Sequence, residues 1–529
     1  MTDLNRRDLI KLFSGAAVVA LAAACATALP AAAQTATPRY GGNLRVLSPT
    51  DVSTLDNTKT LETTARLMSQ PRYETLVTAT PEGSPVNLQP GLATSWTVSP
   101  DGLTYTFQLR PGVTFHGGRT MTSADVAYSI NRLRNPQTAS PFVTLFPKDM
   151  DVQTPTDSTV VLQLTGPFAP LLPALSDSAA SIVDRDAAEA PGGLDTNDGG
   201  TGPFTLSERV QDDHTVIKRF PNYWQPGKPY LDTITFTWNQ DANAQHAALH
   251  SGTVDFLVAP DATTLDDFKS DSNLQIFGPR ADDVMFLLMN IQKPPYSDLR
   301  VRQAIMYATG REEMRSLVNG DYGEPLLGGY LSPRRFGGLK TGIYQPTADL
   351  EKAQALMQEA GVSSFNAQLI TIRGFVFGEK TSQVVQQQLK AIGGNLTIQA
   401  MDIPNLLSSL NGGTFDLLCI GLNTTLDPDQ RLTPTFGTGG ASNWAKWSDA
   451  EYDKLLADAR TSTDTAAREM LYQQAETILG TRGPMAFQYD EGNVDVGSTH
   501  VQGYVVAQLI ADWSGLAGAW LDNAPRTSP

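Results

Sequence analysis

The chain has 529 residues, of which 41% are hydrophobic and 18% charged, and this composition predicts a globular protein with enough apolar residues to fill a core. Its length suffices for roughly three domain-sized units. The formal net charge of -16 argues against a nucleic-acid-binding or anionic-membrane surface, since both need clustered lysine and arginine.

The first 33 residues are expected to be a targeting segment. Arg6–Lys11 fits the twin-arginine export pattern, and an alanine-rich apolar run follows over Leu12–Leu29. Pro30–Ala33 supplies small residues for cleavage at the end of the segment. In an alternative interpretation, Ala22–Cys25 is a lipobox and Cys25 carries a lipid anchor. Both interpretations predict export to the periplasm, with the mature protein either secreted or tethered by lipid.

The first half of the mature chain contains alternating strand and helix signals. Apolar and β-branched runs predict strands at Ser95–Val98, Tyr105–Leu109 and Thr159–Leu164, and Thr122 begins a capped helix. His116, beside two glycines, is predicted to be a hydrogen-bonded turn residue rather than a ligand. The remaining predictions are a strand over Asn43–Leu47, a helix over Leu61–Met68, a loose polar boundary over Asp184–Asp198, a tight bend over Gly200–Phe204, helices over Asn243–Ser251 and Ala262–Lys269, and a strand over Val254–Val258. This alternation is typical of an α/β layer.

The second half begins with a continuously apolar strand, Val284–Asn290, which is predicted to cross into a second large domain. Met485–Tyr489 is predicted to be the strand that returns. Between them we expect helices over 349–360, 380–392, 403–410, 449–459 and 466–479, and strands over 367–372, 396–400 and 415–420. Two crossings between domains make a hinge, which suits closure around a solute.

The sequence offers little for catalysis. It contains no nucleophile elbow, no phosphate-cradling loop and no dinucleotide fingerprint. His246 and His250 lie four residues apart on a predicted helix, but a hydrolytic zinc site needs further ligands and a base, so a solvated helix face is preferred. Cys419 falls in an apolar strand and is expected to be a buried, inert thiol. We therefore predict no enzyme activity, no cofactor and no metal site.

Several motifs together resemble the family-5 extracellular solute-binding proteins, the peptide, nickel and opine receptors of bacterial ABC importers. The longest is Leu92–Arg134, LATSWTVSPDGLTYTFQLRPGVTFHGGRTMTSADVAYSINRLR, and shorter ones are Tyr40–Leu44, Gly200–Phe204, Asn222–Trp224 and Asp298–Ala304. The resemblance implies an α/β, two-lobed periplasmic binding protein of type II in the large three-subdomain form, with a hinge and an interlobe ligand cleft. It also implies a small-molecule solute, an ABC permease with its ATPase as partners, no nucleic acid, and a monomer.

The resemblance implies a division of the chain after the signal segment 1–33. Residues 34–75, 200–283 and 499–529 would form the core of the first lobe. Residues 76–199 would form a β-rich extra subdomain of that lobe, and residues 284–498 the second lobe.

The resemblance also suggests where the ligand lies. Arg373 follows a predicted strand near the place of an arginine that grips a substrate carboxylate, a task suited to a planar guanidinium. An ordinary surface ion pair is the alternative for this arginine. Trp444 is a candidate for stacking on the ligand. In the first lobe, the loop containing Asp51, Val52 and Ser53 and the bend at Phe204 are expected to face the cleft.

The chain departs from the family after Ile420. Peptide-binding members carry Gly-Trp and then an aspartate that neutralises the peptide amino terminus, whereas here Gly421 is followed by Leu422, Asn423 and two threonines, the first of them Thr424. Asp427 is either a substitute acid or the family's structural Asp-Pro. Because a buried ammonium without a counter-charge costs on the order of several kcal/mol, we expect a sugar-like, opine-like or other polar organic solute rather than a free peptide.

The sequence leaves two other classes of function open. A secreted hydrolase would need a nucleophile or metal cluster that the sequence does not display. A receptor for sensing or chemotaxis, or a chaperone-like binder, would share the fold and differ only in its partner.

Overall fold

A computed structural model describes residues 37–60, 62–79, 87–423, 425–506 and 514–523. The chain divides into two compact units, Met1–Pro38 and Arg39–Pro529, and the second contains all the described helices and strands. The predicted targeting segment, with Cys25, and also Thr424 lie outside the described residues. Within those ranges, no helix has the length and hydropathy that crossing a membrane requires.

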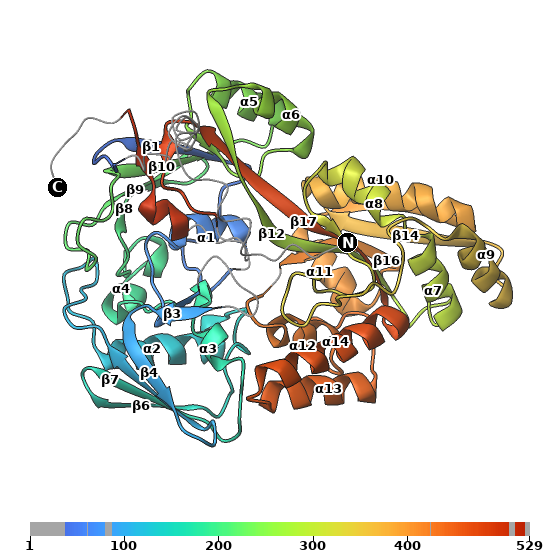
Figure 1. The fold of residues 1–529 in the computed structure, drawn as a ribbon, viewed down its shortest axis with the longest axis horizontal. Coiled ribbons are helices and arrows are strands. Elements are labelled where there is room, and N and C mark those ends of the chain that lie inside the picture. The colour runs from blue at the N-terminus through green and yellow to red at the C-terminus, as the bar shows by residue number, and fades with distance from the viewer. Residues whose placement is uncertain (1–36, 61, 80–86, 424, 507–513, 524–529) are drawn as a thin grey trace, which may run out of the picture. The chain divides into compact units, whose positions relative to one another are not determined.

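One large mixed sheet runs through the second unit (Figure 1). In sheet order its strands are β15 (Gly394–Met401), β14 (Phe365–Ile372), β16 (Leu417–Asn423), β12 (Leu274–Met289), β17 (Met485–Ser498), β11 (Phe256–Leu257), β1 (Asn43–Ser48), β10 (Thr233–Trp238), β9 (His214–Arg219) and β8 (Phe204–Val210), with β13 (Glu324–Pro325) paired to β17.

The long antiparallel strands β12 and β17 join the two halves of this sheet. The C-terminal part of β12 pairs with β16, whereas the C-terminal part of β17 pairs with β11. Both crossing strands were predicted from sequence, at Val284–Asn290 and Met485–Tyr489, and both are confirmed. They extend further than predicted because each continues, through register shifts, into the other half of the sheet.

The apolar run in β12 is continuous because helices cover both faces of its half of the sheet. Val284, Phe286 and Leu288 enter one buried cluster, whereas Met285 and Leu287 enter another. The helices of this half are α7 (Leu299–Ala308), α8 (Arg311–Asn319), α9 (Leu350–Glu359), α10 (Val376–Leu389), α11 (Ile403–Gly412), α12 (Asp429–Phe436), α13 (Ala450–Thr461) and α14 (Thr465–Arg482). Helix α10 begins four residues before the predicted start at Lys380.

The other half of the sheet has its own buried cluster, which includes Leu44, Phe204, Phe236 and Phe256. Val501, from the C-terminal part of the chain, packs into the same cluster. The short elements that contribute to it are α1 (Thr63–Ser69), β18 (Val501–Gln502) and β19 (Trp520–Leu521), whereas α5 (Ala242–His250) and α6 (Leu265–Ser270) pack in a separate, smaller cluster. The predicted helix at 243–251 is therefore confirmed as α5.

A separate four-stranded antiparallel sheet, in the order β4-β5-β7-β6, packs with α2 around a buried cluster of its own. Its elements are β4 (Ala93–Val98), β5 (Thr104–Leu109), β6 (Asp151–Thr156), β7 (Thr159–Gln163) and α2 (Ser123–Arg134), and nearby lie β2 (Val77–Ala79), β3 (Leu88–Pro90), α3 (Leu171–Ala174) and α4 (Arg185–Glu189). Thr122 and Asp125 form the capping box that starts α2, as the predicted cap requires.

The stretch from Asp184 to Asp198 is more ordered than predicted. Asp184 caps α4 by accepting a hydrogen bond from the Asp186 N–H, and Asp198 forms a buried ion pair with Arg72 at 3.2 Å. The polar residues that suggested a loose boundary are thus caps and buried partners.

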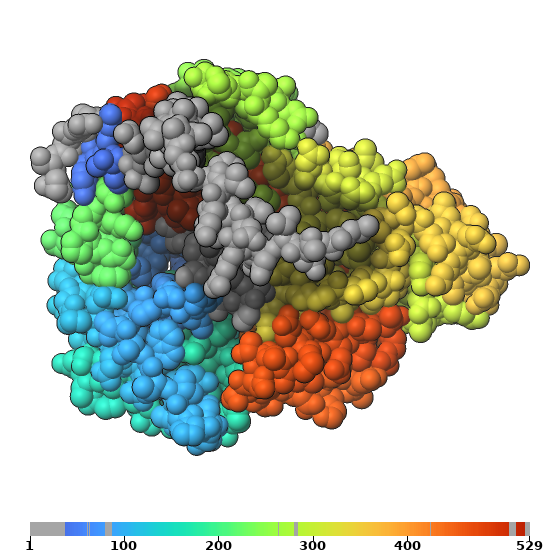
Figure 2. Space-filling view, viewed as in Figure 1, coloured from blue at the N-terminus to red at the C-terminus, as the bar shows by residue number. Residues whose placement is uncertain are grey.

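The four-stranded sheet lies beside α13. In Figure 2 the blue-to-cyan surface of this region meets the orange surface of α13 and α14, and the Ala169 N–H donates to the Arg460 carbonyl at 2.8 Å. Residues nearly 300 positions apart in sequence therefore touch here.

Candidate functional site

Three parallel strands end at one edge of the sheet. Strand β14 is parallel to both β15 and β16, so their carboxyl ends meet there. Arg373 follows β14, Asp402 follows β15, and Leu422 and Asn423 end β16. Polar groups at such an edge are well placed to bind a ligand, because open α/β sheets bind ligands outside the carboxyl ends of their strands.

A second edge of this kind lies in the other half of the sheet. Strand β1 is parallel to β10 and β11. The loop containing Asp51 and Ser53 follows β1, and the segment Ala259–Asp261 follows β11.

The strand registers bring these two edges toward each other. Asn423 is opposite Asp283 of β12, and the next β12 residue, Val284, is opposite Asp490 of β17. Leu257, at the end of β11, is opposite Val496 of the same strand. Both edges therefore converge on the middle of β17, and the region between them is the candidate ligand site.

Two contacts join the edges directly. Lys380 Nζ lies 2.9 and 3.1 Å from the two carboxylate oxygens of Asp261. Leu426, which follows β16, packs against the cluster that contains Phe204 and Phe256.

The segment after β16 is held by hydrogen bonds to its backbone. The Tyr330 hydroxyl lies 2.9 Å from the carbonyl oxygens of both Leu422 and Asn423, and Arg431 Nε donates to the Asn423 carbonyl at 3.0 Å. Thr425 donates its hydroxyl to the Asp427 carbonyl at 2.8 Å. The backbone of this segment is therefore fixed by donors from other parts of the chain.

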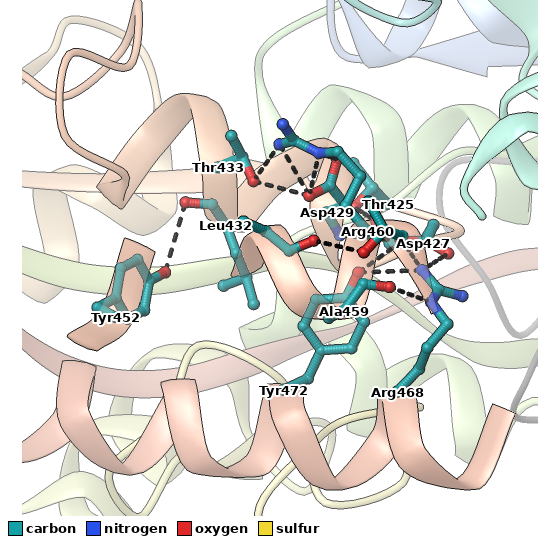
Figure 3. Close-up of polar contacts among 12 residues, drawn as sticks. Thr425, Asp427, Asp429, Leu432, Thr433, Tyr452, Ala459, Arg460, Arg468 and Tyr472 are labelled. Atoms are coloured by element: carbon teal, nitrogen blue, oxygen red, sulfur yellow. Dashed lines mark hydrogen bonds and ion pairs between the residues drawn. The ribbon is translucent and has the colours of Figure 1, made fainter. Parts of the chain in front are cut away.

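The carboxylate of Asp427 already has partners in the fold (Figure 3). It lies 2.8 and 3.0 Å from Arg468 Nη2 and accepts a hydrogen bond from the Tyr472 hydroxyl at 3.3 Å, with only 2% of the residue exposed. The neighbouring Asp429 is paired with Arg460 at 3.0 Å. Both acids after β16 thus serve ion pairs inside this half of the protein.

Arg373 is exposed at the edge of the sheet. Its backbone N–H donates to the Met401 carbonyl at 2.7 Å, and its Nη2 donates to the Ala400 carbonyl at 3.3 Å. The guanidinium makes no ion pair with any residue in the part of the chain that the structure describes, so it retains donors for an anion.

The side chains of the other predicted contact residues differ in how far they are exposed to solvent. Asp51 is tied to Arg209 at 2.9 Å, and Ser53 is exposed. The side chains of Val52 and Phe204 are buried in the core of their half, so a ligand could meet only their backbone. Trp444 is half-buried against the core of the other half.

His116 is the hydrogen-bonded turn residue that the sequence predicted. Its Nε2 lies 2.9 Å from the Gly202 carbonyl oxygen, and its Nδ1 lies 2.9 Å from Asp198 Oδ1. Burial alone would raise the pKa of Asp198, but the Arg72 guanidinium and the hydrogen-bonded His116 ring lower it below its ordinary range. This buried network braces the bend at Gly202 and is structural.

The histidine pair of α5 lies on a helix face that is partly open to solvent, which agrees with the predicted solvated face. The rings of His246 and His250 lie 4.3 Å apart and pack against Phe268, and the two imidazoles face Asp267 and Asp271 at 3.7 and 3.0 Å. Among the described residues, no group of three histidine, cysteine or acidic side chains is arranged to hold a metal ion.

Cys419 is fully buried, and burial raises the pKa of its thiol to about 12. The sequence prediction of an inert core thiol is confirmed.

Sequence reasoning missed the acids of β17. Asp490, Glu491 and Asp495 are buried where the two edges converge, and Asp495 accepts hydrogen bonds from the Tyr504 hydroxyl at 2.8 Å and the Ala259 N–H at 3.2 Å. Acidic residues directly after an apolar strand usually indicate a solvated end. Only the length of β17, visible in the fold, places them inside.

Comparisons with known proteins identify the family and the fold. A family model described as "Bacterial extracellular solute-binding proteins, family 5 Middle" matches residues 87–443. The dipeptide-binding protein of Escherichia coli K12 is 29% identical over 452 residues, which span 79% of this chain and 84% of that protein. The glutathione-binding protein GsiB of the same strain is 26% identical over 509 residues, or 93% and 96% of the two chains.

Solved structures share the fold. The periplasmic binding protein AgaA of A. tumefaciens R10, in complex with agropinic acid, aligns with a TM-score of 0.80 and 25% identity over 92% of this chain and 100% of its own. DppA of Helicobacter pylori, in complex with the peptide STSA, has a TM-score of 0.80 and 24% identity over 92% and 99% of the two chains.

Proposed function

The chain belongs to family 5 of the bacterial extracellular solute-binding proteins, and from this premise we propose that it captures a small polar organic solute and delivers it to an ABC importer. Members of this family are binding proteins and not enzymes, and they work with the permease and ATPase of an importer. We assign the protein to the periplasm, as a monomer. Its first lobe comprises residues 34–75, 200–283 and 499–529, with an extra subdomain at 76–199. Its second lobe comprises residues 284–498.

One observation carries our choice of ligand class: the Asp427 carboxylate is 2.8 Å from Arg468 and buried. A carboxylate neutralised in this way does not serve as the counter-charge for a ligand ammonium. Leu422 and Asn423, at the end of β16, carry no charge. We therefore propose an opine-like or sugar-like solute, rather than a peptide bound through a free amino terminus.

Arg373 supports a solute that carries an anionic group. Its guanidinium is exposed at the same edge as Asn423, and a guanidinium binds a carboxylate with two parallel hydrogen bonds. The ligand of AgaA, agropinic acid, is an acid by name, and AgaA is 25% identical to this chain. We assign Asn423, Thr424 and Ser53 as neutral polar contacts, Asp51 as the brace of its loop, and Trp444 as a stacking surface.

The test is a binding screen with the purified mature protein. Thermal shift and isothermal titration calorimetry would compare agropinic acid, glutathione, Ala-Ala and a set of mono- and disaccharides. A ligand that binds only the folded state raises the free energy of unfolding by RT ln(1 + [L]/Kd), so a true ligand shifts the melting temperature in proportion to the logarithm of its concentration.

Each outcome of the screen decides between functions. Binding of one compound that lacks a free amino group, without its turnover, supports the proposal. Turnover of any compound would indicate a hydrolase, and no shift with any compound would contradict the receptor function.

A further inference from the structure

The Tyr330 hydroxyl occupies a key position beside the candidate site. It lies 2.9 Å from the carbonyl oxygens of Leu422 and Asn423, the last two residues of β16, although 92 residues separate Tyr330 from Leu422 in the sequence. The two residues lie where the family resemblance implies a departure from peptide-binding members. We propose that Tyr330, whose backbone is held by the buried carboxyl group of Glu476, is the positioning residue that sets the backbone at the end of β16, beside the candidate solute site.

The Tyr330 ring is rigidly placed. It is completely buried, and it packs edge-to-face against Phe436 at 5.6 Å and Phe487 at 6.2 Å between ring centroids. Phe487 belongs to β17 and Phe436 to the end of α12. Because the ring is enclosed on two sides, its hydroxyl cannot move away from the two carbonyls without repacking the core.

The backbone that carries Tyr330 is also fixed from inside. Glu476, on α14, is fully buried, and its Oε2 accepts a hydrogen bond from the Leu331 N–H at 2.8 Å. A Cβ at Gly329 would collide with the same oxygen, so glycine at that position admits the carboxylate to the loop backbone. The chain of contacts thus runs from Glu476, through the backbone at 330–331, to the Tyr330 hydroxyl and the two carbonyls.

These hydrogen bonds determine the direction in which the Leu422 and Asn423 carbonyl groups point. The single O–H proton of Tyr330 is shared between the Leu422 and Asn423 carbonyls, and the Asn423 carbonyl also accepts a hydrogen bond from Arg431 Nε at 3.0 Å. A carbonyl oxygen held toward the protein in this way is not turned to the ligand. Loss of the Tyr330 hydroxyl removes a donor from the end of β16, where Leu422 and Asn423 are otherwise held by their pairing with β12, and so loosens the backbone that a solute meets.

This inference rests on the proposed function, since it assigns a role at the same site, and a matched pair of variants tests it. Tyr330→Phe removes only the hydroxyl. Tyr344→Phe is the control, because the Tyr344 hydroxyl is also buried and donates to a backbone carbonyl, that of Gly480, at 2.9 Å, but belongs to the core on the other face of the sheet. A net hydrogen bond corresponds to about a fivefold to tenfold change in affinity.

Two readouts are measured on the wild type and both variants. Calorimetry with the tightest-binding compound of the screen should show about a fivefold to tenfold loss for Tyr330→Phe and less than about twofold for Tyr344→Phe. Hydrogen–deuterium exchange without ligand should be faster in peptides containing Leu422 and Asn423 for Tyr330→Phe only. Glu476→Gln, which keeps an acceptor for the Leu331 N–H, should retain binding, whereas Glu476→Leu should reproduce the Tyr330→Phe exchange pattern.

Equal affinity and equal exchange in the two tyrosine variants would overturn the inference. The exchange readout needs no ligand, so it decides the role of Tyr330 even if the wild type binds no compound of the screen. Absence of binding by the wild type would contradict the proposed function without contradicting the role of Tyr330.

Discussion

Asp427 and Arg468 form a buried ion pair, with 2.8 Å between a carboxylate oxygen and Nη2, just beyond the strand end where a ligand is expected. Both residues belong to the same half of the protein, and the Tyr472 hydroxyl forms hydrogen bonds with both of them. It therefore anchors the segment after β16 to α14 and leaves Asp427 no free charge for a solute.

Removing one partner of this pair should destabilise the protein strongly. Arg468→Leu leaves the Asp427 carboxylate buried without its cation, for which we expect a loss of about 3–5 kcal/mol in the free energy of unfolding. Urea denaturation followed by circular dichroism measures this loss. The control is Lys454→Leu, which breaks an exposed pair with Asp458 and should cost less than about 1 kcal/mol. Equal effects of the two variants would contradict the assignment of Asp427 to a buried structural pair.

Glu476 should make stability fall as pH rises. Burial raises the pKa of this carboxyl to about 8 in the folded protein, against an ordinary value of 4.5. Between these two values the folded state binds the proton and the unfolded state does not, so the stabilisation is complete below about pH 4.5 and is lost as pH rises through about 8.

Comparison with Glu476→Gln isolates this effect. The free energy of unfolding of the wild type should fall relative to the variant by up to about 1.4 kcal/mol per pH unit within that window. Parallel pH profiles from pH 5 to pH 8 would show that Glu476 ionises in the fold as it does in water.

Arg373 should affect binding without affecting stability. It is exposed, and among the described residues it hydrogen-bonds only to backbone carbonyls, so Arg373→Ala should change the free energy of unfolding by less than about 0.5 kcal/mol. Loss of a charged hydrogen bond to a solute carboxylate should weaken binding by about 1.5–3 kcal/mol. Calorimetry and urea denaturation measure the two effects. Arg185→Ala, at an exposed arginine on α4, is the control and should change neither. Unchanged affinity in Arg373→Ala would remove this arginine from the site.

Cys419 should be unreactive in the native protein. Its thiol is completely buried and its pKa is raised to about 12, so almost no thiolate forms at neutral pH. A thiol-reactive dye should label it only after denaturation. Rapid labelling of the mature native protein would show that β16 opens locally.

The sequence was informative wherever a pattern is local. The apolar run of β12 predicted its strand because both faces are covered, and the cap at Thr122 predicted the start of α2. The family resemblance at Leu92–Arg134 is confirmed by the family match, which includes that stretch.

Contacts that depend on distant parts of the chain were beyond local patterns. Nothing near Leu422 in sequence indicates that the Tyr330 hydroxyl holds it, and nothing near Asp427 indicates Arg468, because tertiary folding alone brings these pairs together. The burial of Asp490 and Asp495 likewise depends on the long pairing of β12 with β17, which no local pattern indicates. The contact residues at the site stay predictions.

The most direct test of the central claim is calorimetric titration of the mature wild-type protein with Ala-Ala, N-acetyl-Ala-Ala and agropinic acid. If the Asp427 carboxylate is held by Arg468, a ligand loses no affinity when its ammonium group is removed. N-acetyl-Ala-Ala should then bind at least as well as Ala-Ala, and agropinic acid should bind more tightly than either. Tightest binding by Ala-Ala, with loss of that binding on acetylation, would contradict the account.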